Sequence, residues 1–216
     1  MEHSLYRQIA IEGNIGAGKT TIANRLGKAL EAKVILERFE NNPFLPQFYA
    51  DKERYALQVE LFFLADRYQQ LSKELLGDIF QEYTVYDYHF AKSAIFSSLN
   101  LANHELDLFR NLYSVMERFI PKPDILIYIH HGLERLSNHI DQRGRGIEDN
   151  IPKPYLEQIH LNYMRHFKEQ RHFPIIVLDS GFHSEEYASQ RPSLAFSSSI
   201  YLTLIILILY LGNILP

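Results

Sequence analysis

The sequence predicts an α/β protein with a parallel sheet of about five strands flanked by helices. Three observations predict this fold. Short apolar runs alternate along the chain with longer stretches whose apolar residues recur at helical spacing. A glycine-rich loop follows the first apolar run and opens the first helical stretch. Several apolar runs end directly at a carboxylate. Because ligands bind beyond the carboxyl ends of the strands in such sheets, we expect the functional residues there.

The elements follow one another in a regular order. The predicted strands are the short apolar runs at residues 9–11, 33–36, 84–86, 124–129 and 175–178. The predicted helices are the stretches of helical apolar spacing at residues 21–30, 48–76, 91–119, 133–142 and 155–170. Pro43 and Pro46 break an irregular turn after the second strand, and Pro121 and Pro123 stop the third helical stretch. We find no internal repeat and no linker that would divide the chain.

Composition narrows the class of protein. The 216 residues are 46% hydrophobic and 22% charged, as in ordinary globular proteins. A formal net charge of −4 gives no indication of an electrostatic nucleic-acid binder. The absence of cysteine excludes disulfides and thiolate zinc sites and agrees with a reducing cytoplasm. The first strand begins so early that we expect no signal peptide. We therefore expect a cytoplasmic protein that binds no nucleic acid.

The glycine-rich loop at residues 13–20 reads GNIGAGKT and fits the phosphate-binding pattern G-x-x-x-x-G-K-[ST]. Its glycines let backbone N–H groups approach phosphate oxygens, and the helix that follows adds its positive end. Lys19 would reach the outer phosphates, and the Thr20 hydroxyl would ligate Mg²⁺. The residues predicted to bind ATP are Gly13, Asn14, Ile15, Gly16, Ala17, Gly18, Lys19, Thr20 and Thr21. The alternative is a glycine turn that only joins a strand to a helix.

A phosphate-binding loop does not distinguish hydrolysis of ATP from transfer of its phosphoryl group. No N-K-x-D guanine signature is present, and Asp87 is not followed by x-x-G. A kinase needs a base near the acceptor hydroxyl and cations around the phosphoryl group. Glu37, at a strand end, is the candidate base, and Arg143 and Arg145 are candidate lid cations in a glycine-broken loop. Each could also be an ordinary solvated residue.

Six stretches, in order along the chain, resemble the deoxynucleoside kinase family: GNIGAGKTT, LERFENNPFLPQFY, FFLADRYQQL, VYDYHFAKSAIF, PKPDILIYI and QRGRGIEDNIPKPYLEQI. The resemblance implies ATP- and Mg²⁺-dependent phosphorylation of a deoxynucleoside 5′-hydroxyl in a P-loop kinase fold with an arginine-rich lid. It places the catalytic base, which takes the hydroxyl proton, at Glu37. It places the metal at Thr20 and Asp87 and the lid arginines at Arg143 and Arg145. It places the partners of the sugar 3′-hydroxyl on Tyr49 and Glu148. It also implies a homodimer.

The base-binding positions depart from the common family pattern. Where many members have a glutamine, seven residues before Arg67, this chain has Glu60. Where many have an aspartate that faces the base, it has Lys92, if a one-residue gap is allowed. Guanine presents two adjacent donors that a carboxylate accepts, and two acceptors, O6 and N7, that call for a cation such as Lys92 or Arg67. The exchange favours deoxyguanosine, and bacterial deoxyguanosine kinases resemble this chain. Alternatively, Glu60 and Lys92 pair with each other or point into solvent.

Two further positions differ. Tyr88 replaces an arginine that lies beside the base carboxylate in relatives, so Lys92 or Arg67 would have to take over its charge. His139 stands where relatives have an arginine that stacks on the donor adenine, and we expect it to contact ATP.

The composition changes abruptly after Arg191, and the resemblance ends near Tyr187. We expect a kinase domain at 1–187 and an atypical apolar tail at 188–216, with a nearly unbroken apolar run at 200–211. Such a run is short for a bilayer span and is more often buried or interfacial. Our hypothesis is a frame-shifted or otherwise altered C-terminus.

We therefore expect a deoxyguanosine kinase. The alternatives are a deoxyadenosine or pyrimidine deoxynucleoside kinase, a nucleotide-binding module with impaired catalysis, and a membrane-attached ATPase.

Overall fold

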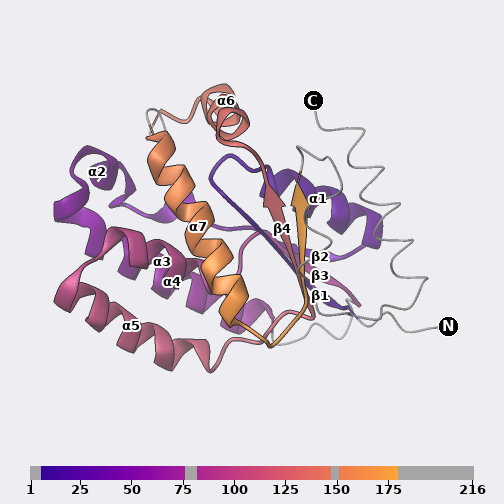
Figure 1. The fold of residues 1–216 in the computed structure, drawn as a ribbon. Helices are drawn as coiled ribbons and strands as arrows, with labels where there is room; N and C mark the ends of the chain where they lie inside the picture. Colours follow the sequence, from indigo (N-terminus) through magenta and orange to yellow (C-terminus); the bar gives the residue numbers. More distant parts are fainter. Residues whose placement is uncertain (1–5, 76–81, 147–150, 180–216) are drawn as a thin grey trace.

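The computed structural model describes residues 6–75, 82–146 and 151–179. Its strands form one parallel sheet, as the sequence predicts, and their order in the sheet is β2-β3-β1-β4-β5 (Figure 1). The strands are β1 (Gln8–Gly13), β2 (Lys33–Ile35), β3 (Thr84–Tyr86), β4 (Ile125–His130) and β5 (Ile175–Asp179). Because every strand runs the same way, their carboxyl ends meet at one edge, where the predicted functional residues follow them.

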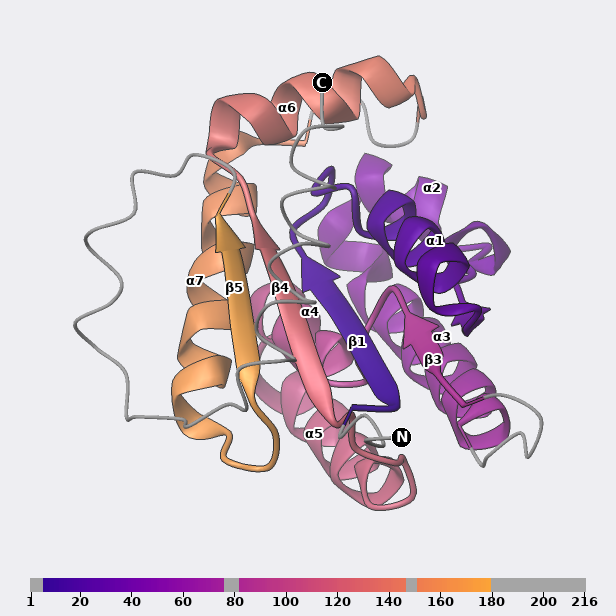
Figure 2. The same cartoon turned by 90° about the vertical axis from the view of Figure 1, so that its right-hand side faces the viewer.

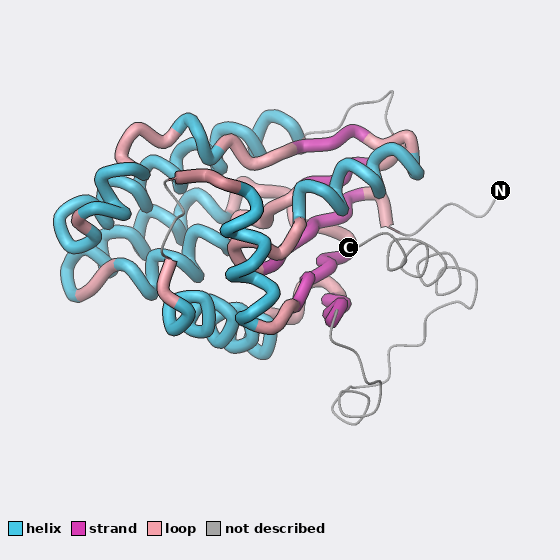
Figure 3. The backbone as a smooth tube through the Cα atoms, turned by 90° about the horizontal axis from the view of Figure 1, so that it is seen from above, coloured by secondary structure: helices cyan, strands magenta, loops and turns pink. Residues whose placement is uncertain are grey.

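Helices cover both faces of the sheet. They are α1 (Lys19–Leu30), α2 (Leu45–Ala50), α3 (Lys52–Glu74), α4 (Lys92–Asn100), α5 (Asn103–Glu117), α6 (Leu133–Arg143) and α7 (Lys153–Glu169), with a short 3₁₀ helix η1 (Phe39–Asn41). The larger layer, of α2, α3, α4, α5 and α7, lies behind the sheet in Figure 2. Helices α1 and α6 pack on the other face. Viewed from above, the larger helical layer lies to one side of the strands (Figure 3).

The two faces are built by alternation along the strands. Ile9 and Ile11 of β1 pack with α1 and α6, whereas Ala10 between them packs toward the larger layer. On β4, Tyr128 is fully buried against α7, where its ring centroid lies 5.1 Å from that of Tyr163. Two separate cores therefore hold the sheet rigid from both sides.

Two predicted helices are each divided in the structure. The sequence predicts one helix over residues 48–76, but the chain breaks at Asp51, whose side chain accepts a hydrogen bond from Arg54 N at 3.3 Å and so caps α3. The predicted stretch at 91–119 is broken between α4 and α5, where Leu101 is extended and Asn103 has a φ of 50°. Apolar spacing continues through both breaks, which is why it does not reveal them.

No helix in the described ranges has the length and apolar character needed to cross a membrane. The predicted tail at 188–216 lies outside the described residues.

Candidate active site

The glycine loop wraps around a space at the carboxyl end of β1. Gly16 and Gly18 have φ angles of 78° and 79°, in the left-handed region that favours glycine. The Lys19 ammonium donates to Gly13 O at 3.0 Å and to Asn14 O at 2.8 Å, so the loop holds its own lysine in place. Since α1 begins at Lys19, its unpaired N–H groups and positive end face this space. The arrangement suits a phosphate group.

Lys19 lies among buried charges. Burial lowers the pKa of its ammonium to about 8, and the Lys92 ammonium acts in the same direction, while the carboxylates of Glu12, Glu37 and Asp87 oppose the shift. An anion in the loop would raise this pKa by adding a counter-charge.

His139 of α6 contacts the same loop. Its Nδ1 lies 2.9 Å from Gly16 O, and because a carbonyl only accepts, Nδ1 carries the proton in this contact. His139 therefore supports the loop backbone in this structure. That it also contacts the donor adenine stays a prediction.

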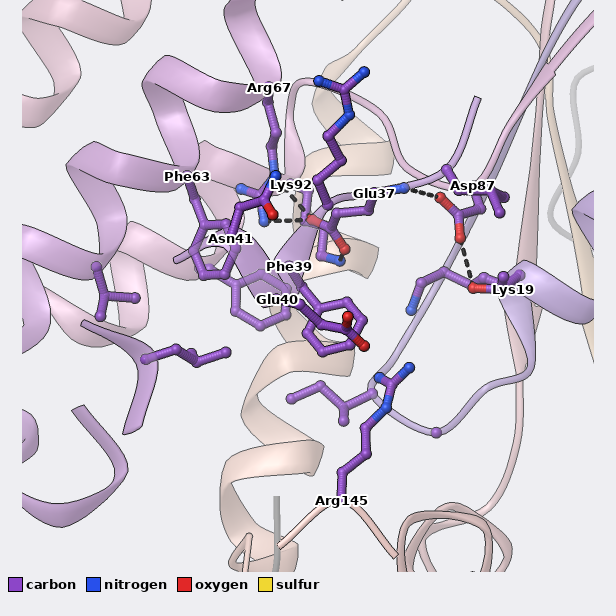
Figure 4. A pocket seen from close by; sticks show the side chains of 18 of the residues that line it. Lys19, Glu37, Phe39, Glu40, Asn41, Phe63, Arg67, Asp87, Lys92 and Arg145 are labelled. Atoms are coloured by element: carbon purple, nitrogen blue, oxygen red, sulfur yellow. Dashed lines mark hydrogen bonds and ion pairs between the residues drawn. The ribbon is translucent and has the colours of Figure 1, made fainter. Parts of the chain in front are cut away.

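Asp87 joins two parts of the site through its two oxygens. Oδ2 accepts from the Thr20 hydroxyl at 2.6 Å, and Oδ1 accepts from the Glu37 backbone N–H at 2.7 Å (Figure 4). Asp87 follows β3 and is 3% exposed. A carboxylate and a hydroxyl side by side are the hard oxygen donors that Mg²⁺ takes, so these residues fit the predicted metal.

Glu37 is held by two cations. Arg67 of α3 donates to Oε1 from Nε at 2.9 Å and from Nη2 at 2.7 Å, and the Lys92 ammonium of α4 lies 2.5 Å from Oε2 (Figure 4). Burial would raise the pKa of the Glu37 carboxyl, but Lys92 and Arg67 outweigh it and hold the pKa below its ordinary value. Glu37 is therefore a carboxylate fixed at the rim of the phosphate loop.

These contacts bear on the missing arginine. The Tyr88 side chain is fully buried. Its hydroxyl donates to Gln70 Oε1 at 2.6 Å and supplies no charge beside Glu37. Gln70 in turn donates to Leu36 O at 3.1 Å, one residue before Glu37. The two cations beside Glu37 are Arg67 and Lys92, which the sequence names as candidates for the missing charge. That they also read the base stays a prediction.

Glu60 of α3 is 2% exposed and does not pair with Lys92. Its Oε1 accepts from Asn100 Nδ2 at 2.6 Å, and Tyr155 OH donates to Asn100 Oδ1 at 3.0 Å. Its Oε2 is buried with no hydrogen-bond partner among the described residues. The alternative that Glu60 and Lys92 pair, or that Glu60 points into solvent, is therefore wrong.

One cavity of about 400 Å³ brings these groups together. Among the predicted site residues, it is lined by Ile15, Gly16, Ala17, Gly18, Lys19, Thr20, Glu37, Tyr49, Glu60, Arg67, Asp87, Lys92, Arg143 and Arg145. Gly13, Asn14, Thr21 and His139 lie outside its lining, and Glu148 lies outside the described residues. The Arg145 guanidinium stacks 4.0 Å above the Phe39 ring, so the loop after α6 reaches the turn that carries Glu37.

Sequence reasoning missed three residues of this region. Asn100 and Tyr155 hold Glu60; Asn100 lies outside the six matching stretches, and Tyr155 lies in the last of them without being assigned a role. Glu12, inside the apolar strand β1, is 1% exposed; its Oε1 accepts from His89 N at 2.7 Å and its Oε2 from Tyr163 OH at 2.7 Å. An acidic residue within a buried strand was the available signal for Glu12, since such a group needs partners.

Comparison with known proteins identifies the family. Residues 9–192 match the family model described as deoxynucleoside kinase. This chain belongs to the deoxynucleoside kinase family. Deoxyguanosine kinase of Bacillus subtilis is 40% identical over 158 residues, which are 72% of this chain and 75% of that enzyme. The deoxyadenosine/deoxycytidine kinase of the same organism is 32% identical over 164 residues, or 72% and 74% of the two chains.

A solved structure gives the same answer for the fold. Deoxyadenosine kinase from M. mycoides with bound dATP is 26% identical, with a TM-score of 0.71 over 94% of this chain and 100% of that chain. The predicted family and the parallel α/β kinase fold are thereby confirmed. This deoxynucleoside kinase takes a phosphoryl group from a nucleotide donor and transfers it to a deoxynucleoside.

Proposed function

We propose that this kinase transfers the γ-phosphoryl group of ATP, with Mg²⁺, to the 5′-hydroxyl of deoxyguanosine. The observation that carries the choice of base is the buried Glu60 Oε2, which lacks a hydrogen-bond partner among the described residues and belongs to a side chain of the cavity wall. Guanine offers N1–H and N2–H₂, two adjacent donors that a carboxylate accepts. The 40% identical deoxyguanosine kinase of B. subtilis supports the same choice.

The phosphoryl-transfer groups lie at the strand ends. Glu37 accepts the proton of the 5′-hydroxyl as it attacks. Lys19, Arg143 and Arg145 stabilise the negative charge on the phosphoryl oxygens. The Thr20 hydroxyl and the Asp87 carboxylate hold Mg²⁺, which when bound neutralises charge on the phosphates.

The sugar and the base are held by the helical layer. Tyr49 lines the cavity and, with Glu148, binds the 3′-hydroxyl. Glu60 accepts from the guanine edge. Arg67 and Lys92 are the proposed donors to guanine O6 and N7. In this structure both donate to Glu37, so a contact with guanine requires one of these side chains to change its rotamer.

The test is ADP release from Mg·ATP with deoxyguanosine, deoxyadenosine, deoxycytidine, thymidine and guanosine as acceptors. We expect the highest kcat/KM with deoxyguanosine, and guanosine, which carries a 2′-hydroxyl, to be the poorer purine. A preference for deoxyadenosine or deoxycytidine at pH 8 would overturn the assignment of the base. Nucleotide binding without turnover on any acceptor would overturn the proposal of an active enzyme.

Three further expectations stay proposals. We propose that residues 1–187 form the kinase domain and 188–216 an apolar extension of it. We propose a homodimer and a cytoplasmic location. Light scattering of the full chain tests the homodimer, and a monomer at micromolar concentration would contradict it.

A further inference from the structure

The side chain of Glu60 is held by a relay that uses one of its oxygens. Tyr155 of α7 donates to Asn100 Oδ1, which fixes the orientation of the amide, and Asn100 Nδ2 then donates to Glu60 Oε1. The other oxygen, Oε2, is fully buried without a partner among the residues described. Oε1 keeps a second lone pair, so neither oxygen of this cavity-lining carboxyl group has its full set of hydrogen-bond partners among the described residues.

The charged groups around Glu60 do not fix it as a carboxylate. On α3, Arg67 donates to Glu37, and Lys52 donates to a backbone carbonyl at 3.5 Å; on α4, Lys92 also contacts Glu37. Burial raises the pKa of Glu60 to about 7, against the Asn100 hydrogen bond and the charges of Arg67, Lys52 and Lys92. A buried carboxyl group that has no ion pair and one unpartnered oxygen among the described residues is therefore more readily protonated than an exposed glutamate.

The two states of a carboxyl group match different bases. A carboxylate is an acceptor at both oxygens and fits guanine, which presents donors at N1 and N2. A carboxylic acid is a donor at one oxygen and an acceptor at the other. That pattern fits adenine, with an acceptor at N1 and a donor at N6, and cytosine, with an acceptor at N3 and a donor at N4.

We propose that the protonation state of Glu60 selects the base: the carboxylate takes deoxyguanosine, and the carboxylic acid takes deoxyadenosine or deoxycytidine. The proposal rests on the proposed function in taking Glu60 as the group that faces the base. Asn100 and Tyr155 are positioning residues that fix the carboxyl group of Glu60 in the cavity wall.

The experiment is an internal competition. Deoxyguanosine and deoxyadenosine are phosphorylated in one mixture by the full chain at pH 6, 7 and 8, and the two monophosphates are separated and counted. The product ratio reports the ratio of kcat/KM values, in which pH effects on Glu37, the metal and ATP cancel because both substrates use them. We expect the ratio to rise in favour of deoxyguanosine by about tenfold per pH unit, because the ratio of carboxylate to acid does so.

Three variants separate selection from a structural role. Glu60→Gln presents one donor and one acceptor at every pH, so we expect a ratio that no longer changes with pH. Glu53→Gln, an exposed change on the same helix, should keep the tenfold slope. Asn100→Leu removes the donor to Oε1, so the ratio at each pH should shift toward deoxyadenosine while its slope stays.

The outcomes also separate this inference from the proposed function. A deoxyguanosine preference that is flat across pH would overturn the inference and leave the proposed function intact. A tenfold slope with deoxyadenosine ahead at every pH would support the selection by protonation and overturn the assignment to deoxyguanosine. Retention of the slope in Glu60→Gln would place the titrating group elsewhere and overturn the inference.

Discussion

Replacing Glu37 with glutamine tests whether the carboxylate and its two cations form one unit. In the structure, Glu37 receives two hydrogen bonds from Arg67 and one from Lys92, with side chains 13%, 4% and 9% exposed. Glutamine is nearly the same size but leaves both cations buried without their counter-charge. Removing one partner of a buried ion pair costs about 3–5 kcal/mol of unfolding free energy, so we expect a loss in that range at pH 7.

The loss should depend on pH in a defined direction. The cations hold the folded pKa of Glu37 below its ordinary value against the effect of burial. A carboxylate with a depressed folded pKa contributes its stability above the unfolded pKa, about 4.3, and loses it as the pH falls. The difference between the wild type and Glu37→Gln should therefore be constant from pH 7 to 5 and shrink by up to about 1.4 kcal/mol per pH unit below pH 4.

Urea unfolding of both proteins at several pH values measures this difference. Glu40→Gln, an exposed carboxylate three residues further on, is the control and should unfold like the wild type. In folded samples we also expect Glu37→Gln to lower kcat by about 10²–10⁴-fold, the usual contribution of a general base. A variant within 1 kcal/mol of the wild type at pH 7 would refute the argument, as would a difference that stays constant into acid.

Three other changes have defined outcomes. Thr20→Val removes the donor to Asp87 and a proposed Mg²⁺ ligand, so kcat/KM should fall by roughly tenfold or more and require more Mg²⁺ in a metal titration; an unchanged Mg²⁺ dependence would contradict this. Tyr88→Phe leaves Gln70 Oε1 unsatisfied and should cost about 1–3 kcal/mol in urea unfolding, and a neutral effect would show that water replaces the hydroxyl. Glu60 has a folded pKa of about 7, above its unfolded value, so wild-type stability should fall by about 3 kcal/mol between pH 5 and pH 8 through this group; Glu60→Gln should lack that decrease, and identical profiles would count against the raised pKa.

The strands were predictable because each is a short apolar run with no helical spacing. All five predicted runs coincide with observed strands to within a residue or two. The helix breaks at Asp51 and at residues 101–102 were not predictable, because the apolar spacing continues across them and only the cap geometry marks the helix ends.

In the candidate site, too, some features could be predicted from the sequence and others could not. Positions at strand ends, such as Glu37 and Asp87, follow from topology, because parallel strands deliver their carboxyl ends to one edge. Partner choice does not follow from topology. Lys92 could face Glu60 or Glu37, and only the packing of α4 against α3 decides for Glu37. The hold of Asn100 on Glu60 likewise depends on a distance between two helices that no local pattern encodes.

Asp87 has a consequence for how this enzyme can change over evolution. The Asp87 carboxylate spans from the Thr20 hydroxyl to the Glu37 backbone N–H. The spacing between the phosphate loop and the turn that carries Glu37 is therefore set by the width of a single side chain. Glu60, which is proposed to recognise the nucleobase, takes its hydrogen bond from Asn100 and not from a residue of this bridge. Substitutions at Glu60 and Asn100 can therefore retune the choice of nucleoside while the Asp87 bridge is inherited unchanged. Substitutions at Arg67 or Lys92 would disturb Glu37 as well, because both residues bond its carboxylate.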